Sequence, residues 1–161
     1  MYRILFICHG NICRSPMAEF IMKSLVREAG LEKDFHIESA AVSAEEIGNG
    51  IYPPARRCLS AHGIPFDSTR TAWQITPREY GRFDLLIYMD RSNLRWLQRI
   101  LGGGQGNGHG FDPEGKIHLM MEYAGLTRDV ADPWYTDDFE TTYRDLTTAC
   151  TALLRQLTER S

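Results

Sequence analysis

The sequence predicts an α/β protein whose parallel sheet is covered by helices on both faces. Strand-like and helix-like segments alternate along the 161 residues, which is the pattern of right-handed β-α-β crossovers. One strand-like segment, residues 83–89, is almost continuously apolar, as expected for a strand buried on both faces. At this length we expect one domain spanning residues 1–161.

The first half of the chain is expected to form a strand, a helix and a second strand. Residues 4–7 are apolar and make the first strand. Apolar residues then recur at helical spacing from Pro16 until Gly30, since proline is tolerated where helices begin and glycine is typical where they end. Residues 35–41 form the second expected strand.

The second half is expected to begin with a short helix over residues 53–62, which precedes the apolar strand. A helix over 93–101 and a weak strand over 116–120 follow that strand. The last helix is strongly amphipathic, with apolar side chains at positions 139, 143, 146, 150, 153, 154 and 157. The glycine-rich residues 102–110 lack the spacing of a nucleotide-binding loop, so we expect a flexible surface connection there.

Composition excludes several classes of function. A formal charge of −3 gives no general attraction to nucleic acid or to anionic membranes. No apolar run reaches the roughly 18 residues of a membrane span, and the N-terminus lacks a signal-peptide pattern. The four cysteines have no disulfide-framework spacing, which favours a reducing compartment. We expect a cytoplasmic protein, and an acidic domain without an obvious apolar patch is expected to be a monomer.

The segment directly after the first strand determines the expected chemistry. It reads Cys8-His9-Gly10-Asn11-Ile12-Cys13-Arg14-Ser15. Cys8 ends the strand at the carboxyl edge of the sheet, where open α/β sheets place ligands. Backbone N–H groups of the loop and of the following helix start form an anion-binding nest, which favours the nucleophilic thiolate. Arg14 offers a planar fork for two oxygens of an oxyanion. We therefore predict a phosphate pocket with Cys8 as nucleophile.

A cysteine at the end of a strand is more often a structural core residue. Here it is followed, in the order that a phosphate loop needs, by the loop formers Gly10 and Asn11, the arginine, and Ser15 with its proline neighbour. Ser15 is a candidate helix N-cap or proton donor. This combination favours the catalytic interpretation over the structural one.

The loop and the four residues after it, Pro-Met-Ala-Glu, resemble the active-site signature of the low-molecular-weight protein tyrosine phosphatases. Residues 39–43, 62–64, 89–94 and 132–135 are similar to further family segments and follow in family order. Cys-x5-Arg alone is shared by unrelated phosphatase folds, but together with the distant Asp-Pro-aromatic-aromatic motif it is highly specific. The resemblance implies a flavodoxin-like three-layer sandwich with four central strands, and the hydrolysis of phosphotyrosine.

The expected mechanism uses three residues. Loop amides and Arg14 hold the phosphate oxygens, and the Cys8 thiolate attacks phosphorus in line with the leaving oxygen. Asp132 protonates the leaving group and then activates the water that hydrolyses the phosphocysteine. Asp129 and Asp137 are competing acids on the same loop. We expect neither a metal nor another cofactor, because the loop and the arginine already neutralise the phosphate.

The resemblance also assigns supporting roles to Asn11, Ser15, Ser39 and His62. Asn11 would hold the loop by side-chain hydrogen bonds, and Ser15 would stabilise the leaving thiolate of Cys8. His62 has two possible roles, since it is either a supporting residue or a histidine satisfied at a helix end.

The other cysteines have different expected roles. Cys13 lies five residues after Cys8, so a reversible disulfide between them would protect the nucleophile from irreversible oxidation. Cys58 and Cys150 fall on apolar helix faces, and we expect both in the core.

The substrate slot departs from the family pattern. Eukaryotic members commonly carry an aromatic residue two positions after the Ser-Ala-x-x-Ser segment, where this chain has Glu45 and Glu46. Trp134 and Tyr135 are expected to form the other wall of a slot for an aryl phosphate, or else to pack the acid loop. His9 is expected at the rim. We therefore predict weaker stacking of the substrate than in aromatic-walled relatives.

Other functions of similar phosphate loops fit this sequence less well than phosphotyrosine hydrolysis. Related phosphoarginine phosphatases typically have threonine before the second loop cysteine, and the apolar Ile12 at that position favours phosphotyrosine. Arsenate reductases need further cysteines near the end of the third strand, where residues 84–90 contain none. A silent phosphate-binding module needs no nucleophile and acid together. We expect a phosphotyrosine-containing protein or peptide as substrate and inorganic phosphate as product.

Overall fold

The computed structural model describes residues 1–102 and 111–159. Within them it holds a four-stranded parallel sheet, as predicted, and the strands lie in the order β2-β1-β3-β4. The strands are β1 (Tyr2–Cys8), β2 (Phe35–Ala41), β3 (Leu85–Tyr88) and β4 (Ile117–Leu119). Strand β2 pairs with one edge of β1, and the chain then crosses over to β3, which pairs with the other edge of β1. This switch in direction opens a crevice at the carboxyl ends of β1 and β3, where such sheets bind ligands.

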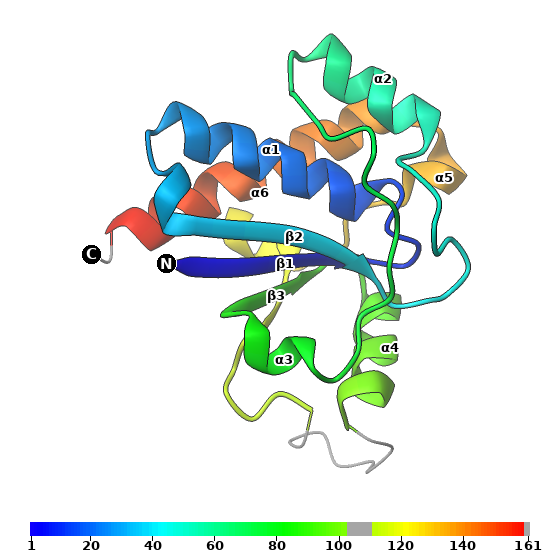
Figure 1. Ribbon diagram of the computed structural model, residues 1–161, viewed down its shortest axis with the longest axis vertical. Helices are drawn as coiled ribbons and strands as arrows, with labels where there is room; N and C mark the ends of the chain where they lie inside the picture. Colours follow the sequence, from blue (N-terminus) through cyan, green and yellow to red (C-terminus); the bar gives the residue numbers. More distant parts are fainter. Residues whose placement is uncertain (103–110, 160–161) are drawn as a thin grey trace.

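Helices cover both faces of the sheet. Figure 1 shows α1, α2 and α6 above the sheet in that view and α3 and α4 below it. The helices are α1 (Arg14–Glu28), α2 (Pro53–Ala61), α3 (Glu79–Arg82), α4 (Arg91–Gly102), α5 (Pro133–Thr136) and α6 (Phe139–Glu159), with short 3-10 turns at Glu32–Asp34 and Met120–Ala124. The expected three-layer arrangement is confirmed. The short α3 and α5, and the 3-10 turns, were not anticipated.

Strand β1 is the centre of the core because its side chains are buried on both faces. Ile4, Phe6 and Cys8 belong to the cluster under α1 and α6. Leu5 and Ile7 belong to the opposite cluster, which includes side chains of α4. Burial of each such aliphatic or aromatic side chain contributes about 1.5–3 kcal/mol. The last residue of this rigid strand is the predicted nucleophile.

The start of α1 differs from the prediction. The helix begins at Arg14, two residues before Pro16, and Cys13 precedes it with φ −124° and ψ −85° and no side-chain cap. Ser15 is therefore the second residue of the helix and not its N-cap. Its hydroxyl faces the Cys8 sulfur instead. Pro16 is accommodated in the first turn, where backbone N–H groups have no partner within the helix.

The remaining expectations concern two cysteines, the glycine-rich segment and membrane-spanning helices. Cys58 and Cys150 are buried, as predicted. The expected surface connection at 102–110 falls, apart from Gly102 at the end of α4, outside the described residues. None of the helices in residues 1–102 and 111–159 combines the length and the hydropathy needed to cross a bilayer.

Candidate active site

The loop between β1 and α1 curls around the sulfur of Cys8. The backbone N–H groups of Asn11 and Ser15 donate to Cys8 Sγ at 3.3 and 3.4 Å, and the Ser15 hydroxyl lies 3.0 Å from it. Donors from both the loop and the helix start therefore point at one atom. This arrangement suits a negatively charged sulfur and an anionic ligand above it.

Asn11 holds the loop in shape through its side chain. Its φ of +61° is in the left-handed region, which asparagine tolerates better than most residues. Its Nδ2 donates to Ser15 Oγ at 2.8 Å and to Ser39 Oγ at 2.9 Å, and its Oδ1 accepts the N–H of Trp73 at 3.4 Å. The Ser39 hydroxyl in turn donates to Glu19 at 2.6 Å. The structure thus brings Asn11, Ser15 and Ser39 together, as expected.

Arg70 is a loop contact that the sequence did not reveal. Its guanidinium donates to the backbone oxygen of Asn11 at 3.0 Å and also to Asn11 Oδ1. Burial lowers the pKa of Arg70, an effect that the charges of Glu19 and Cys8 oppose. The arginine lies in the segment between α2 and α3. This segment runs beside the end of β2, where an isolated bridge joins Ala41 and Gln74. No sequence motif includes Arg70, because it reaches the loop only through tertiary packing.

Arg14 lies beneath the pocket and is almost fully buried, with 2% of its surface exposed. Its Nη1 donates to Asp90 Oδ2 at 2.7 Å and to the Val130 backbone oxygen at 2.9 Å. Its Nη2 lies 3.4 Å from Asp132 Oδ2. Burial would lower the pKa of Arg14, but the negative charges of Cys8, Asp132 and Asp90 raise it above the ordinary value. The guanidinium is therefore fixed in place and charged.

Asp90 is a second functional residue that sequence reasoning missed. It follows β3, and its Oδ1 accepts the N–H of Asn93 at 2.8 Å, the contact of a helix N-cap. Asn93 Oδ1 accepts the N–H groups of Met89 and Asp90. The sequence signal that could have identified Asp90 is its position just after the third strand, at the sheet edge where ligands bind. The stretch around Asp90 resembles a family segment, but the resemblance alone gives the aspartate no role.

Asp132 is held at the N-terminus of α5. Its Oδ1 accepts the N–H of Trp134 at 3.0 Å, and its other oxygen faces Arg14. Of the three candidate acids, Asp132 lines the pocket. Asp137 instead ends α5 with φ +58°. The geometry therefore favours Asp132 as the group that exchanges protons with a ligand.

The pocket above Cys8 has a volume of about 140 Å³. Its lining comprises Cys8, His9, Gly10, Ile12, Cys13, Arg14, Glu45, Glu46, Asp132, Trp134 and Tyr135. The expected slot residues are thus brought together, with two carboxylates among them. Residues Trp134 and Tyr135 are 52% and 84% exposed, so both can contact a ligand.

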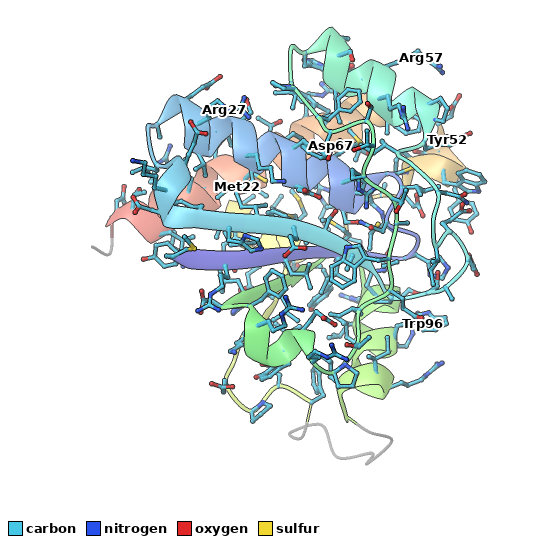
Figure 2. All side chains as sticks on the ribbon, viewed as in Figure 1. Met22, Arg27, Tyr52, Arg57, Asp67 and Trp96 are labelled. Carbon is cyan, nitrogen blue, oxygen red and sulfur yellow. The ribbon has the colours of Figure 1, made fainter. Side chains whose placement is uncertain are left out.

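Rings outside the pocket support its two walls. Trp134 packs against Tyr52 with ring centroids 4.7 Å apart. His9 Nε2 lies 3.0 Å from Glu45 Oε2, and the His9 ring meets the edge of Trp96 at 5.8 Å. Figure 2 shows Tyr52 near α5 and Trp96 on α4, both on the side of the molecule where β1 ends.

His62 is not brought to the phosphate loop. It follows α2, with Nε2 2.8 Å from Glu140 Oε2 and its ring stacked on Tyr143 at 3.7 Å. Of the two roles expected for His62, this geometry fits the histidine satisfied at a helix end. The loop contact belongs to Arg70 instead, because the segment after α2 runs back along the end of β2.

Cys13 is buried beside the nucleophile. Burial, reinforced by the nearby charges of Cys8 and Asp132, raises the pKa of its thiol, so Cys13 is protonated at neutral pH. Both Cys8 and Cys13 are free thiols in this structure. The reversible disulfide between them stays a prediction.

The comparisons with known proteins agree with this geometry. The family model for low molecular weight phosphotyrosine protein phosphatase matches residues 3–161. The human low molecular weight phosphotyrosine protein phosphatase is 37% identical over 159 residues, covering 95% of this chain and 94% of that protein. The crystal structure of the low molecular weight protein tyrosine phosphatase from Streptococcus pyogenes has a TM-score of 0.82 and 40% identity, covering 98% of this chain and 93% of that one.

A further solved relative is named for a different substrate. The Drosophila arginine phosphatase has a TM-score of 0.83 and 28% identity, covering 96% of each chain. The family-model match and the human relative both extend over nearly the whole chain. The chain therefore belongs to the low molecular weight phosphotyrosine protein phosphatase family.

Proposed function

We propose that this protein is a protein tyrosine phosphatase that hydrolyses phosphotyrosine through a phosphocysteine intermediate on Cys8. The observation that carries the proposal is the convergence of three groups on one pocket from distant parts of the chain. They are the sulfur of Cys8, the buried guanidinium of Arg14 and the carboxyl group of Asp132. A nucleophile, an oxyanion binder and an acid are the parts that displacement at phosphorus needs.

In the first step the phosphate oxygens bind the loop N–H groups and Arg14. The Cys8 thiolate attacks phosphorus, the bond between phosphorus and the tyrosine oxygen breaks, and Asp132 donates its proton to that oxygen. In the second step the Asp132 carboxylate takes a proton from water, and the resulting hydroxide attacks phosphorus. The phosphorus–sulfur bond then breaks, which releases inorganic phosphate and restores the thiolate, with the Ser15 hydroxyl 3.0 Å from the departing sulfur.

The position of Asp132 suits its change of role. Its Oδ2 lies 3.4 Å from Arg14 Nη2, and its Oδ1 accepts the N–H of Trp134 at 3.0 Å. Asp132 and Arg14 line the same pocket, so a phosphate bound by the guanidinium would lie beside this carboxyl group. Asp132 is therefore placed to exchange a proton first with the leaving oxygen and then with water.

Two further features of the proposal follow from the same contacts. Arg14 and the loop N–H groups supply the positive charge that a metal supplies in other phosphatases, so we propose metal-free catalysis. The four cysteines are free thiols, in keeping with a reducing compartment such as the cytoplasm. The monomeric state stays a prediction.

Phosphoarginine is the second candidate substrate, favoured by one feature of the pocket. The carboxylates of Glu45 and Glu46 line it, and a carboxylate can pair with a guanidinium. The similarity to the Drosophila arginine phosphatase points in the same direction. Against it, the apolar side chain of Ile12 also lines the pocket and offers no hydrogen bond to a guanidinium.

The experiment that separates these substrates measures phosphate release from a phosphotyrosine peptide and a phosphoarginine peptide with a chelator present. We expect phosphotyrosine turnover that Cys8→Ser abolishes. A preference for phosphoarginine would retain the mechanism and overturn the substrate. If neither peptide is hydrolysed in a Cys8-dependent way, the pocket only binds phosphate and the proposal is wrong.

Asp132→Asn tests the acid separately. The variant keeps the cap on Trp134 but has no proton to donate. Its kcat should therefore fall by roughly 10²–10⁴-fold for phosphotyrosine, and much less for aryl phosphates with activated leaving groups. The activity of the native enzyme should also fall as pH rises, because the acid must be protonated. Equal losses across a leaving-group series would assign the proton to another residue.

A further inference from the structure

Three metal-ligating side chains meet outside the pocket, where the end of α2 approaches the start of α6 (Figure 1). Cys58 and His62 are four residues apart, so they lie on the same side of the helix. Glu140 comes from the first turn of α6. Their donor atoms all lie within 4.8 Å of one another. We propose that Cys58 Sγ, His62 Nε2 and the Glu140 carboxylate form a binding site for Zn²⁺.

The distances between donors are close to those around a zinc ion. Bond lengths of about 2.3 Å to sulfur and about 2.0–2.2 Å to nitrogen or oxygen place tetrahedral donors roughly 3.4–3.6 Å apart. Cys58 Sγ is 3.6 Å from Glu140 Oε1. His62 Nε2 is 3.0 and 2.8 Å from the two Glu140 oxygens. A separation larger by about half an ångström between the histidine and the glutamate would match the zinc geometry for this pair, and the Cys58 sulfur lies within 4.8 Å of a ring nitrogen of His62.

The surroundings suit a site with an open fourth position. Cys58 is buried with 6% exposure, whereas the His62 and Glu140 side chains are 33% and 57% exposed. The Tyr143 ring is stacked on His62 at 3.7 Å and 11°, which fixes the plane of the imidazole. Three protein ligands therefore face a position that a water molecule can fill.

The charges at the site favour a dication. The Cys58 thiol donates to Glu140 Oε1 at 3.6 Å, so a negatively charged oxygen already faces the sulfur. Zinc replaces the thiol proton: the S–H bond breaks, a sulfur–zinc bond forms and one proton is released to solvent. Thiolate and imidazole donors favour zinc over magnesium or calcium.

The test uses the full chain with Cys8→Ser and Cys13→Ser, which removes the thiols of the phosphate loop. The thiols that remain are Cys58 and the fully buried Cys150. Cobalt(II) serves as the spectroscopic probe, because a thiolate ligand produces a charge-transfer band in the near ultraviolet. We expect the band to saturate at one equivalent of cobalt and to disappear when zinc is added. Zinc should also raise the thermal unfolding midpoint.

Substitutions identify the ligands. Cys58→Ser should abolish the band, and His62→Gln and Glu140→Gln should each weaken zinc binding by at least about tenfold, the loss that even outer-shell changes cause. His36→Gln is the matched control, because His36 pairs with Glu38 at 2.6 Å on the surface without a thiol. Zinc affinity in the control should be unchanged.

The pH dependence provides a readout that does not depend on any substitution. Because binding releases the Cys58 proton, zinc affinity should rise about tenfold per pH unit above neutrality. A cobalt band that survives Cys58→Ser, or no band and no thermal shift in the folded background protein, would overturn the proposal and leave a hydrogen-bonded triad. None of the three ligands lines the pocket, so neither result bears on the phosphatase activity.

Discussion

Asn11 and Arg70 together determine the shape of the phosphate loop. Asn11 adopts a left-handed backbone with φ +61°, and it places the N–H groups of the loop around the Cys8 sulfur. Arg70 contacts both the backbone and the side-chain oxygen of Asn11. A charged donor that satisfies two oxygens stabilises this strained conformation.

Arg70→Met should therefore lower activity without touching the substrate. The variant loses charge-assisted hydrogen bonds of about 1–3 kcal/mol, which correspond to roughly 5- to 150-fold in kcat/KM. We expect most of the loss in kcat, because the loop N–H groups act on the transition state. Arg57→Met is the matched control, since Arg57 is an exposed residue of α2 (Figure 2). Steady-state kinetics with normal kcat in Arg70→Met would remove the arginine from the positioning role.

Glu45 makes one wall of the pocket acidic instead of aromatic. Glu45→Trp should add ring stacking with an aryl phosphate, worth about 0.5–1.5 kcal/mol, and lower KM by roughly two- to twelvefold. Glu45→Gln separates the contribution of charge from that of stacking, because it removes the negative charge that lies 3.0 Å from His9 Nε2 but adds no ring. Measurements of KM for an aryl phosphate distinguish stacking from charge. An equal fall in KM in both variants would assign the effect to charge.

Helices α1 and α6 pack as a pair on one face of the sheet. Cys150 of α6 is completely buried, and its sulfur lies 3.9 Å from the backbone oxygen of Ala18 in α1. Burial raises the pKa of this thiol. The folded protein therefore holds a proton that the unfolded chain releases at about pH 8.5.

This difference predicts a loss of stability at alkaline pH. Above about pH 8.5 the unfolded state binds fewer protons than the folded state, so the free energy of unfolding falls as pH rises toward the folded-state pKa. One thiol contributes up to about 1.4 kcal/mol per pH unit. Urea unfolding between pH 8 and 11 measures this change. In Cys150→Ala the free energy of unfolding should fall less steeply with pH, because the cavity lowers stability by the same amount at every pH. Thr151→Ala changes an exposed neighbour and should keep the native slope, whereas an unchanged slope in Cys150→Ala would contradict the assignment.

The whole molecule assembles the pocket from four separate segments. The end of β1 supplies the nucleophile, the segment after β2 supplies the acidic wall, Asp90 after β3 holds Arg14, and the α5 segment supplies Asp132. A ligand that binds this assembly binds only the folded chain. Its binding free energy is therefore added to the stability of the fold.

Inorganic phosphate should accordingly raise the thermal unfolding midpoint. At a concentration of 100 Kd the gain is about 2.7 kcal/mol, or roughly 5–10 °C for a domain of this size. Arg14→Lys should shrink the shift, because lysine keeps the charge but loses the fork that grips two oxygens. Arg57→Ala should leave it intact. A full phosphate shift in Arg14→Lys would mean that the loop N–H groups alone bind the anion.

The sheet, the covering helices and three candidate site residues could be predicted from the sequence, because these features depend on local patterns. Apolar runs mark β1 and β3, and Cys8, Arg14 and Asp132 lie in motifs that can be recognised along the chain. Three other features could not be predicted: the contact of Arg70 with the loop, the anchoring of Arg14 by Asp90 and the position of His62 at the junction of α2 and α6. Each depends on which segment comes to lie beside the loop. That is decided by the packing of elements far apart in the sequence, and it leaves no local periodicity or spacing to detect.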